Sequence, residues 1–304
     1  METSYVIALL VAGLIGVVLN FLMIFKLLSS KNMSSFHKLC LFKAIPNLLI
    51  SASFPFWICP LTFLDFKIAN LPRSLNVFIA EFIGLFCYYF APFILICMSL
   101  NRFIAIYFPF RKSSSSQFPY TNCAIISCSV LASGPVLIPK FFNCYFVYDP
   151  ELGVFMSEDV ERCGPSMDTF VIYSILILAF ISNGFNLAIF AKLIKDKMTG
   201  VSEDQKVKRK KKWQSMYIQS AIQDFLQVLD IINFNLISGL IDSPVWYFTF
   251  STLSFVCIYA LDGAVMMYFH SGSRSFFCDV NAKKKSSTFV SGMQLSGAKK
   301  SRVN

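Results

Sequence analysis

The stretch that decides the fold runs from Glu81 to Lys112 and has the sequence EFIGLFCYYFAPFILICMSLNRFIAIYFPFRK. Glu81 precedes Arg102 by 21 positions, and only uncharged residues lie between them. At about 1.5 Å per helical residue this separation is about 32 Å, close to the thickness of the hydrocarbon core of a bilayer. The stretch therefore predicts a membrane-spanning helix that carries one charge at each face of the bilayer.

The composition of the whole chain agrees with a lipid environment. Hydrophobic residues make up 56% of the 304 residues, and charged residues make up only 14%. A soluble domain carries about 25% charged residues, so this chain has too few to cover a globule in water. No basic residues precede the first apolar run, and we expect that run to remain as a transmembrane helix rather than to be cleaved as a signal peptide.

Seven apolar runs are each long enough to cross a bilayer. We therefore expect an all-α membrane protein, a seven-transmembrane helix bundle that forms one domain over residues 1–275. The Ser- and Lys-rich segment 276–304 is predicted to be a disordered cytoplasmic tail. The predicted helices span about residues 5–28, 38–60, 76–101, 120–142, 169–192, 214–239 and 245–270.

The distribution of basic residues orients this multi-pass chain, because cytoplasmic loops carry an excess of Lys and Arg. If the N-terminus is extracellular, only four of the 27 basic residues fall on the outer side, namely Lys67, Arg73, Lys140 and Arg162. The basic tail then lies inside the cell, which requires an odd number of spans. The pattern predicts an extracellular N-terminus and a cytoplasmic C-terminus.

Cysteines are numerous, and most of the ten lie in the apolar runs. Cys144 and Cys163 share the longest predicted outer loop, where the environment is oxidising. A bridge between them would close a loop of about 20 residues and stabilise it by about 3 kcal/mol. Cys59, near the outer end of the second run, is a competing partner. Cys278, just after the last helix, is a candidate for palmitoylation.

Signatures of catalysis and metal binding are missing from the sequence. Its two histidines, His37 and His270, are far apart, and there is no HExxH, Walker or Gly-x-Ser-x-Gly motif. We therefore expect a binding and signalling protein that is not an enzyme and needs no cofactor or metal. The basic run Lys206–Lys212 is expected to attract anionic lipid. We predict the bilayer, and no nucleic acid, as its partner.

Polar residues inside apolar runs point to functional positions, because they are costly in lipid. Asn20, Asn47 and Asp262 lie at similar predicted depth in the first, second and seventh runs. The two amides could satisfy the single carboxylate by hydrogen bonding, without a second charge. We expect these three residues to form an intramembrane network. The alternative is that the amides only join neighbouring helices.

Candidate ligand-binding residues follow from the helical period. At 100° per residue, Tyr88 lies on the same face of its helix as Arg102, but in the outer half of the membrane. Asp230 and Asn233 lie at a similar depth in the sixth run. These three residues are predicted to contact a ligand, and the alternative is that they serve helix packing and interhelical hydrogen bonding.

Several short motifs, taken in order, resemble those of a known receptor family. The chain is similar to G-protein-coupled receptors and, more closely, to nematode serpentine chemoreceptors of class X. The resemblance covers about residues 5–275. It is carried by Gly13-x-x-Gly16-x-x-x-Asn20, Lys43-Ala44-Ile45-Pro46-Asn47, Phe56-Trp57-x-x-Pro60, Asn101-Arg102-Phe103 with Phe108-Pro109, Cys144-Tyr145-Phe146, Ile222-Gln223-Asp224 and Leu261-Asp262-Gly263.

The resemblance implies a chemosensory receptor in the plasma membrane, at a sensory cilium. A small-molecule ligand would bind in the outer half of the bundle, and a heterotrimeric G protein would bind at the inner face. Arg102 resembles the arginine of the Asp-Arg-Tyr motif of rhodopsin-like receptors, and we assign Arg102 and Asn101 to G-protein coupling and activation. Asn101 stands where that motif has an acid, so another group must hold Arg102 in the resting state.

Two alternatives from other functional classes stay open at this point. A seven-span transporter or channel would have related halves or paired broken helices around its substrate. A receptor-like scaffold would have no ligand of its own.

Overall fold

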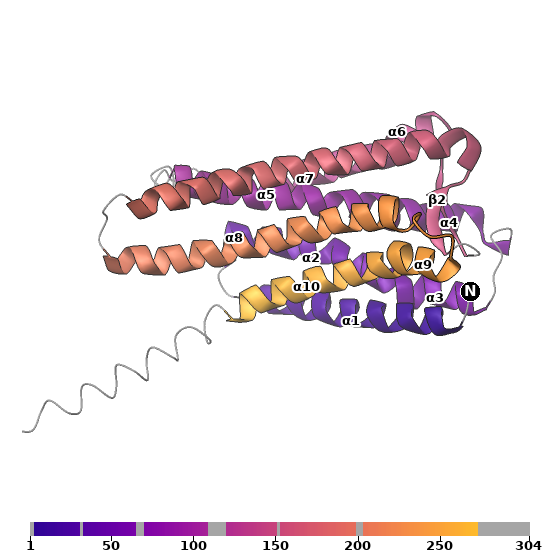
Figure 1. Ribbon diagram of the computed structural model, residues 1–304, viewed down its shortest axis with the longest axis horizontal. Helices are drawn as coiled ribbons and strands as arrows, with labels where there is room; N and C mark the ends of the chain where they lie inside the picture. Colours follow the sequence, from indigo (N-terminus) through magenta and orange to yellow (C-terminus); the bar gives the residue numbers. More distant parts are fainter. Residues whose placement is uncertain are drawn as a thin grey trace, which may run out of the picture.

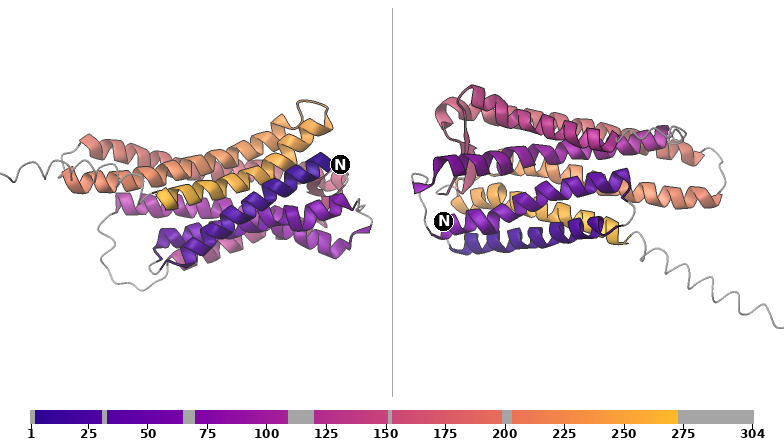
Figure 2. Two further views of the ribbon diagram at one scale, coloured as in Figure 1. Left: turned by 90° about the horizontal axis from the view of Figure 1, so that it is seen from below. Right: turned by 180° about the vertical axis from the view of Figure 1, so that it is seen from behind.

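The computed structural model describes residues 3–30, 33–64, 70–108, 120–150, 153–198 and 203–272. Within these residues the chain forms seven helical passes that run side by side in an elongated bundle (Figures 1 and 2). In chain order the passes are α1 (Thr3–Leu28); α2 (Ser35–Ser53), η1 (Phe54–Ile58) and α3 (Cys59–Phe63); α4 (Arg73–Ile79), η3 (Ala80–Cys87) and α5 (Tyr88–Tyr107); α6 (Tyr120–Phe141); α7 (Val160–Met198); α8 (Glu203–Ile232) and η5 (Asn233–Ile237); and α9 (Pro244–Phe248), η6 (Thr249–Leu253) and α10 (Ser254–Gly272).

The third pass is the centre of the bundle. Its helix α5 packs against α2, α6, α7 and α8, and half of its residues are buried. The pass is longer than the sequence pattern predicts, because its helix begins at Arg73 and continues to Tyr107. Glu81 and Arg102 are both buried inside the protein, with 4% and 2% exposure. Their positions at opposite faces of a membrane stay a prediction. Protein groups, instead of water, satisfy both charges.

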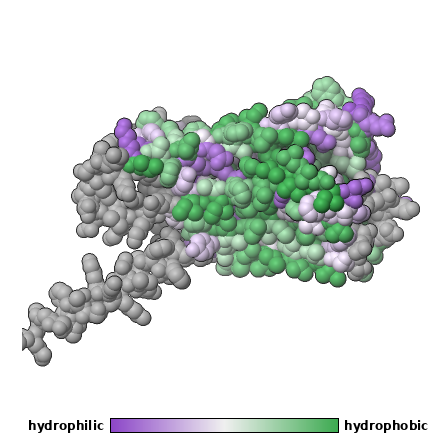
Figure 3. Space-filling view, in the orientation of Figure 1, coloured by the Kyte–Doolittle hydropathy of each residue, from purple (hydrophilic) through white to green (hydrophobic). Residues whose placement is uncertain are grey.

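Six of the passes are long and apolar enough to cross a membrane, counting only the described part of the chain. The sixth pass is the exception, because its helix α8 begins in a basic segment and carries several polar side chains that face the bundle. Figure 3 shows a broad apolar surface over the middle of the molecule, with hydrophilic residues towards the ends. The buried polar residues of α8 are Gln219, Ser220, Gln223, Asp224 and Asp230.

A β-hairpin between α6 and α7 is the departure from the all-α expectation. Strands β1 (Phe146–Asp149) and β2 (Val154–Ser157) pair antiparallel, with Phe146 opposite Ser157. Helix α7 then begins at Val160, whereas its apolar pattern predicts a start near residue 169. The carboxylate of Asp159 accepts a hydrogen bond of 3.1 Å from the Arg162 backbone N–H. This N-terminal cap starts the helix before its apolar run begins.

The two ends of the bundle differ in structure. The hairpin, α4, α9 and the N-terminal end of α1 lie together at one end, which we call the hairpin end (Figure 1). The last turns of α7 and the first turns of α8 lie at the opposite end. Pro109, the predicted tail 276–304 and Cys278 lie outside the described residues.

Candidate functional site

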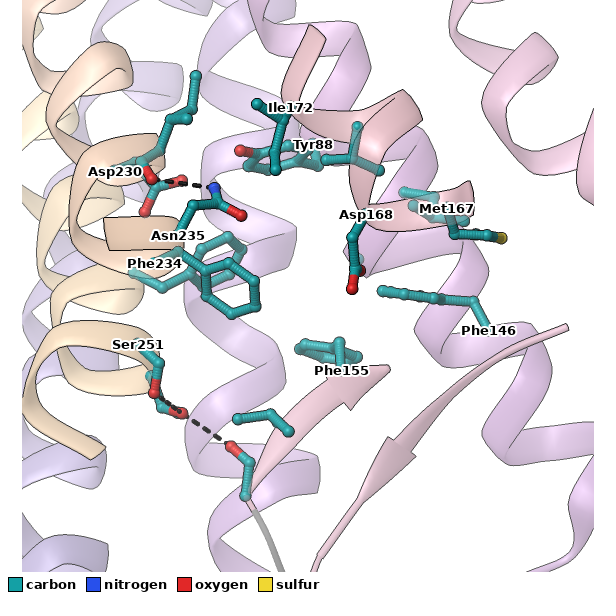
Figure 4. Close-up of a pocket in the computed structure, with 18 of the residues that line it drawn as sticks. Tyr88, Phe146, Phe155, Met167, Asp168, Ile172, Asp230, Phe234, Asn235 and Ser251 are labelled. Carbon is teal, nitrogen blue, oxygen red and sulfur yellow. Dashed lines mark hydrogen bonds between the residues drawn. The ribbon is translucent and has the colours of Figure 1, made fainter. Parts of the chain in front are cut away.

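A cavity of about 110 Å³ lies under the β-hairpin (Figure 4). We call it the hairpin cavity. Its walls come mainly from the third, fifth, sixth and seventh passes, and the hairpin forms its roof. Apolar and aromatic side chains dominate the lining, with a few polar groups among them, as in most small-molecule sites. It is lined by Phe54, Gly84, Leu85, Tyr88, Phe146, Gly153, Val154, Phe155, Met167, Asp168, Val171, Ile172, Asp230, Ile231, Phe234, Asn235, Ser251, Thr252 and Phe255.

Local backbone geometry aims many of these side chains at the cavity. The described residues contain four π-helical segments, η1, η3, η5 and η6, and each contributes to the lining. In these segments a backbone N–H bonds to the carbonyl five residues earlier, as Ser238 does to Asn233 at 2.9 Å. The wider turn changes which side chains face the interior, and π-helical turns are frequent at functional sites.

Gly84, in η3, allows the hairpin to rest directly on the third pass. A Cβ atom at this position would lie 3.1 Å from the Phe146 ring and 3.3 Å from the Phe155 ring. These distances are shorter than ordinary van der Waals contact, so a larger residue would push the roof away. The glycine therefore sets the height of the cavity.

Asp230 and Tyr88 form the polar end of the cavity. Asp230 is 4% exposed and Tyr88 is 9% exposed. Figure 4 shows the Tyr88 hydroxyl pointing across the cavity towards the Asp230 carboxyl. A second carboxylate, that of Asp168 on α7, lines the cavity near the rings of Phe146 and Phe155. The phenol supplies one hydrogen-bond donor to a carboxylate that can accept about four.

The hairpin roof is attached to three neighbouring elements. The Asn76 amide of α4 pairs with the Tyr148 backbone, donating at 2.9 Å to its carbonyl and accepting at 3.1 Å from its N–H. The Thr252 hydroxyl of η6 donates to the Gly153 carbonyl at 2.8 Å. A disulfide joins Cys144, before β1, to Cys163 in the first turn of α7. Cys59 is a free, buried thiol.

An ion pair also connects the roof to α4. The Arg73 guanidinium donates to both carboxylate oxygens of Glu158, at 2.6 and 2.7 Å. These hydrogen bonds lower the pKa of Glu158 below its usual value, and partial burial opposes the shift. The link is therefore retained at neutral pH.

The predicted ligand-binding residues separate in the structure. Tyr88 and Asp230 line the hairpin cavity. Asn233 is outside its lining and donates a hydrogen bond of 2.6 Å to the Ser254 hydroxyl, so it joins the sixth and seventh passes. The sequence analysis did not predict the hairpin residues and Asp168 as part of the site. Nothing in the hydropathy pattern of the predicted outer loop indicates that this loop folds back over the bundle.

The intramembrane network forms around Asp262, with one unexpected member. The Asn47 amide donates a hydrogen bond to the Asp262 carboxylate. Lys43, one helical turn before Asn47, forms an ion pair of 2.5 Å with the same oxygen. The sequence interpretation expected no second charge in this network, and the Lys43–Asp262 ion pair shows that this expectation is wrong. The helical spacing of Lys43 and Asn47 was the available signal.

Asn20 lies beside this pair and bonds to the backbone. Its amide donates to the Gly16 carbonyl at 2.9 Å and to the Tyr259 carbonyl at 3.3 Å. Gly263, next to Asp262, permits this approach, because a Cβ atom there would lie 2.8 Å from both Asn20 amide atoms. Asn20 thus joins the first and seventh passes immediately next to the Lys43–Asp262 pair.

A smaller cavity of about 20 Å³ connects the two polar sites. Asp230 lines both this cavity and the hairpin cavity, and Lys43, Asn47 and Asp262 line the smaller one. Gln223 of α8 also lines it, and its amide has no hydrogen-bond partner within the described protein. Asp230 therefore lies between the hairpin cavity and the Lys43–Asp262 ion pair.

Arg102 occupies the interior of the opposite half of the bundle. Its Nε donates to the Met98 carbonyl at 3.0 Å, and one Nη donates to the Ser99 hydroxyl at 3.2 Å. The other Nη donates to the Met216 carbonyl of α8. The guanidinium carbon lies 5.7 Å from the centre of the Phe36 ring of α2. Arg102 therefore joins three passes, while Asn101 is only half-buried.

An acid from α8 balances Arg102 through intervening polar groups. The Asp224 carboxylate accepts from the Ser182 hydroxyl at 2.9 Å and from the Asn186 amide at 2.6 Å. The Ser99 hydroxyl, which contacts Arg102, donates to Asn186 at 3.3 Å. The acid missing at position 101 is thus supplied at a distance by α8, through side chains of α5 and α7.

Comparison with known proteins identifies the family. No curated protein matches the chain. The model of the serpentine type 7TM GPCR chemoreceptor Srx family matches residues 10–270, which include the hairpin cavity, the Lys43–Asp262 pair and Arg102. The resemblance drawn from the motifs is therefore confirmed, and the multi-pass arrangement agrees with the six apolar helices. The chain belongs to the Srx family of serpentine seven-transmembrane chemoreceptors.

Proposed function

We propose that the protein is a chemosensory receptor that binds a small molecule in the hairpin cavity and activates a heterotrimeric G protein at the opposite end of the bundle. The hairpin end is then extracellular, as the basic-residue pattern predicts. The receptor would lie in the plasma membrane of a sensory cilium. The observation that carries the proposal is the position of Asp230, which lines the cavity on the same helix that accepts a hydrogen bond from Arg102.

Helix α8 supplies the physical connection between the two ends. Asp230 lies in the cavity, Asp224 bonds to α7, and the Met216 carbonyl accepts from Arg102. A ligand that binds Asp230 more tightly in one position of α8 shifts the population towards that position. Movement of α8 breaks the Met216 contact, which frees the Arg102 guanidinium for the G protein.

The test is ligand-evoked signalling in cells that express the receptor with a G protein and a calcium indicator. The Arg102→Ala variant is expected to reach the cell surface and to lose the response, because the cation that contacts the G protein is gone. Arg162→Ala, which removes a cation at the hairpin end, is the matched control and is expected to respond normally. An unchanged dose–response curve for Arg102→Ala would contradict the proposal.

The same cells distinguish the transporter or channel alternative. A receptor needs the G protein for any response, whereas a transporter or channel produces uptake or current without it. Ligand-dependent uptake or current in cells that lack the G protein would therefore replace the proposal with that alternative.

A further inference from the structure

The hairpin cavity has an acidic lining. Asp168 and Asp230 contribute carboxylates, and no Lys, Arg or His is found among its described lining residues. Neither carboxylate takes part in the ion pairs of the described residues, which join Lys43 to Asp262, Arg73 to Glu158 and Lys140 to Glu81. Asp262 and Glu81 are thus paired with lysines, and Asp224 accepts two hydrogen bonds. Asp168 and Asp230 have no such cation and face a space that a cationic ligand can enter.

Asp230 is the carboxylate with the stronger need for a partner. Its side chain is buried, and a buried carboxylate is costly unless it is paired or fully hydrogen-bonded. The Tyr88 hydroxyl faces it from the third pass and satisfies only part of its capacity (Figure 4). An ammonium group between these side chains would donate to the carboxylate and lie against the tyrosine ring.

Six aromatic residues contribute to the remaining wall. Phe146 and Phe155 of the roof stack at 6.3 Å between ring centres, and Tyr88 lies 5.9 Å from Phe255. Aromatic faces attract cations through their quadrupole, and they also accommodate an apolar ligand body. A carboxylate at one end of an aromatic enclosure matches an amphipathic cation, with its charge at one end and an apolar group at the other.

The volume limits the ligand. A cavity of 150 Å³ in an engineered protein binds benzene, and the hairpin cavity of about 110 Å³ is of this order. We infer that the hairpin cavity binds a small primary amine with a short aromatic or branched apolar body, its ammonium group held by Asp230. Asp168, the more exposed carboxylate, attracts the cation towards the cavity. This inference rests on the proposed ligand site and adds its chemical class.

Binding to the purified full-length receptor in lipid nanodiscs tests the inference without a G protein. Benzylamine, benzyl alcohol and benzoate are suitable probes, because they share one ring and differ mainly in charge. Wild-type receptor is expected to bind benzylamine at least about tenfold more tightly than benzyl alcohol, and benzoate more weakly still. Thermal stabilisation at increasing probe concentration measures all three.

Variants assign the preference to the two carboxylates. Asp230→Asn keeps the shape of the side chain and is expected to reduce the preference for amine over alcohol to about twofold or less. Asp168→Asn is expected to weaken amine binding by a smaller factor. Asp242→Asn removes an exposed charge outside the cavity and is expected to bind as wild type does.

Several results would overturn the inference. These are equal binding of amine and alcohol by wild type, an Asp230→Asn preference equal to that of wild type, or binding of none of the probes. If Asp230→Asn does not fold, the wild-type ratio and Asp168→Asn decide the question. Amine binding without signalling in cells would contradict only the proposed receptor activity. Signalling by neutral or acidic molecules, with no amine preference, would contradict only the ligand class.

Discussion

Lys43 and Asp262 form a 2.5 Å ion pair between the second and seventh passes, with side-chain exposures of 3% and 7%. The Asn47 amide donates to the same carboxylate, so three polar groups meet inside the bundle. Isolated charges are expensive in such an environment, and each of these two makes the other tolerable. The pair is therefore a point at which a change in one residue can be compensated by a change in the other.

Removal of one partner is expected to destabilise the receptor strongly. Lys43→Met leaves the Asp262 carboxylate buried without its cation, at a cost of about 3–5 kcal/mol. The double variant Lys43→Met, Asp262→Asn is expected to recover most of this loss, because no uncompensated charge remains. Thermal denaturation of the purified receptor measures both effects. Lys38→Met on the same helix is the control, and equal losses in the single and double variants would argue against the pair.

Gly263→Ala is expected to disturb the contact between the first and seventh passes. The added methyl group would lie 2.8 Å from the Asn20 amide, so the helices must separate or the amide must leave its hydrogen bonds. We expect a loss of about 1–3 kcal/mol in the free energy of unfolding.

Gly184→Ala on α7 is the matched control for this substitution. No atom lies within 4 Å of a Cβ at that position, so we expect unchanged or slightly increased stability. If both alanine variants unfold at the same temperature, the close approach of Asn20 to Gly263 has no energetic importance.

The Cys144–Cys163 disulfide is expected to hold the roof over the hairpin cavity. The two residues are 19 positions apart. A disulfide that closes a loop of this size stabilises the folded protein by about 3 kcal/mol, because it lowers the conformational entropy of the unfolded chain. Cys144→Ser is expected to lower both thermal stability and probe affinity, and reducing agent should then have no further effect. Cys123→Ser, which changes an exposed free thiol, serves as the control. Wild-type affinity in Cys144→Ser would show that the roof needs no bridge.

The Arg73–Glu158 pair is expected to make the roof sensitive to acid. The pKa of Glu158 is lowered from its ordinary value of 4.5, chiefly by hydrogen bonds from Arg73. The ion pair therefore contributes its full stabilisation above pH 4.5. This stabilisation is lost as the pH falls through the lower pKa that Glu158 has in the folded protein.

Hydrogen exchange of the hairpin amides in wild type and Glu158→Gln measures this effect. Exchange is expected to be faster in Glu158→Gln at neutral pH, and the difference should disappear at acidic pH, when Glu158 of the wild type is protonated. Glu161→Gln controls for the loss of a nearby exposed carboxylate. A difference that persists unchanged in acid would contradict the assignment.

Asp224→Asn is expected to raise signalling in the absence of ligand. The Asp224 carboxylate accepts hydrogen bonds from Ser182 and Asn186 of α7, and the same polar groups reach Arg102 through Ser99. Without its charge α8 is held less firmly, and we expect basal activity to rise several times. Basal calcium signalling at matched surface expression measures the effect. Asp242→Asn is the control, and equal basal activity would argue against this network as the resting-state constraint.

Much of the fold was predictable because lipid imposes a simple requirement. A spanning helix needs about 20 apolar residues, and this requirement appears in the sequence as long uninterrupted runs. Helix ends were less predictable, since caps such as Asp159 and the polar first turns of α7 lie outside the apolar pattern. The sixth pass illustrates the same limit, because its interior-facing polar residues serve contacts between helices rather than with lipid.

The candidate site was predictable only in part. Tyr88 and Asp230 follow from helical periodicity and a shared depth, and both line the cavity. Asn233, three residues after Asp230, has a different environment because its amide bonds to the Ser254 hydroxyl of the seventh pass, and the π-helical turn η5 begins at this residue. A uniform period of 3.6 residues anticipates neither a partner on another pass nor the π-helical turn that brings Phe234 and Asn235 into the lining.

The sequence by itself determined that the chain spans a membrane several times, that its family is the serpentine chemoreceptors, and that Arg102 and Asp262 are polar positions of interest. Only the tertiary structure decided their partners: Lys43 for Asp262, the Met216 carbonyl for Arg102, and Asp168 with the hairpin above Asp230. The physical reason is the distance along the chain over which each effect acts. Hydropathy and periodicity act within one helix, whereas charge compensation and cavity formation depend on side chains that meet from distant passes.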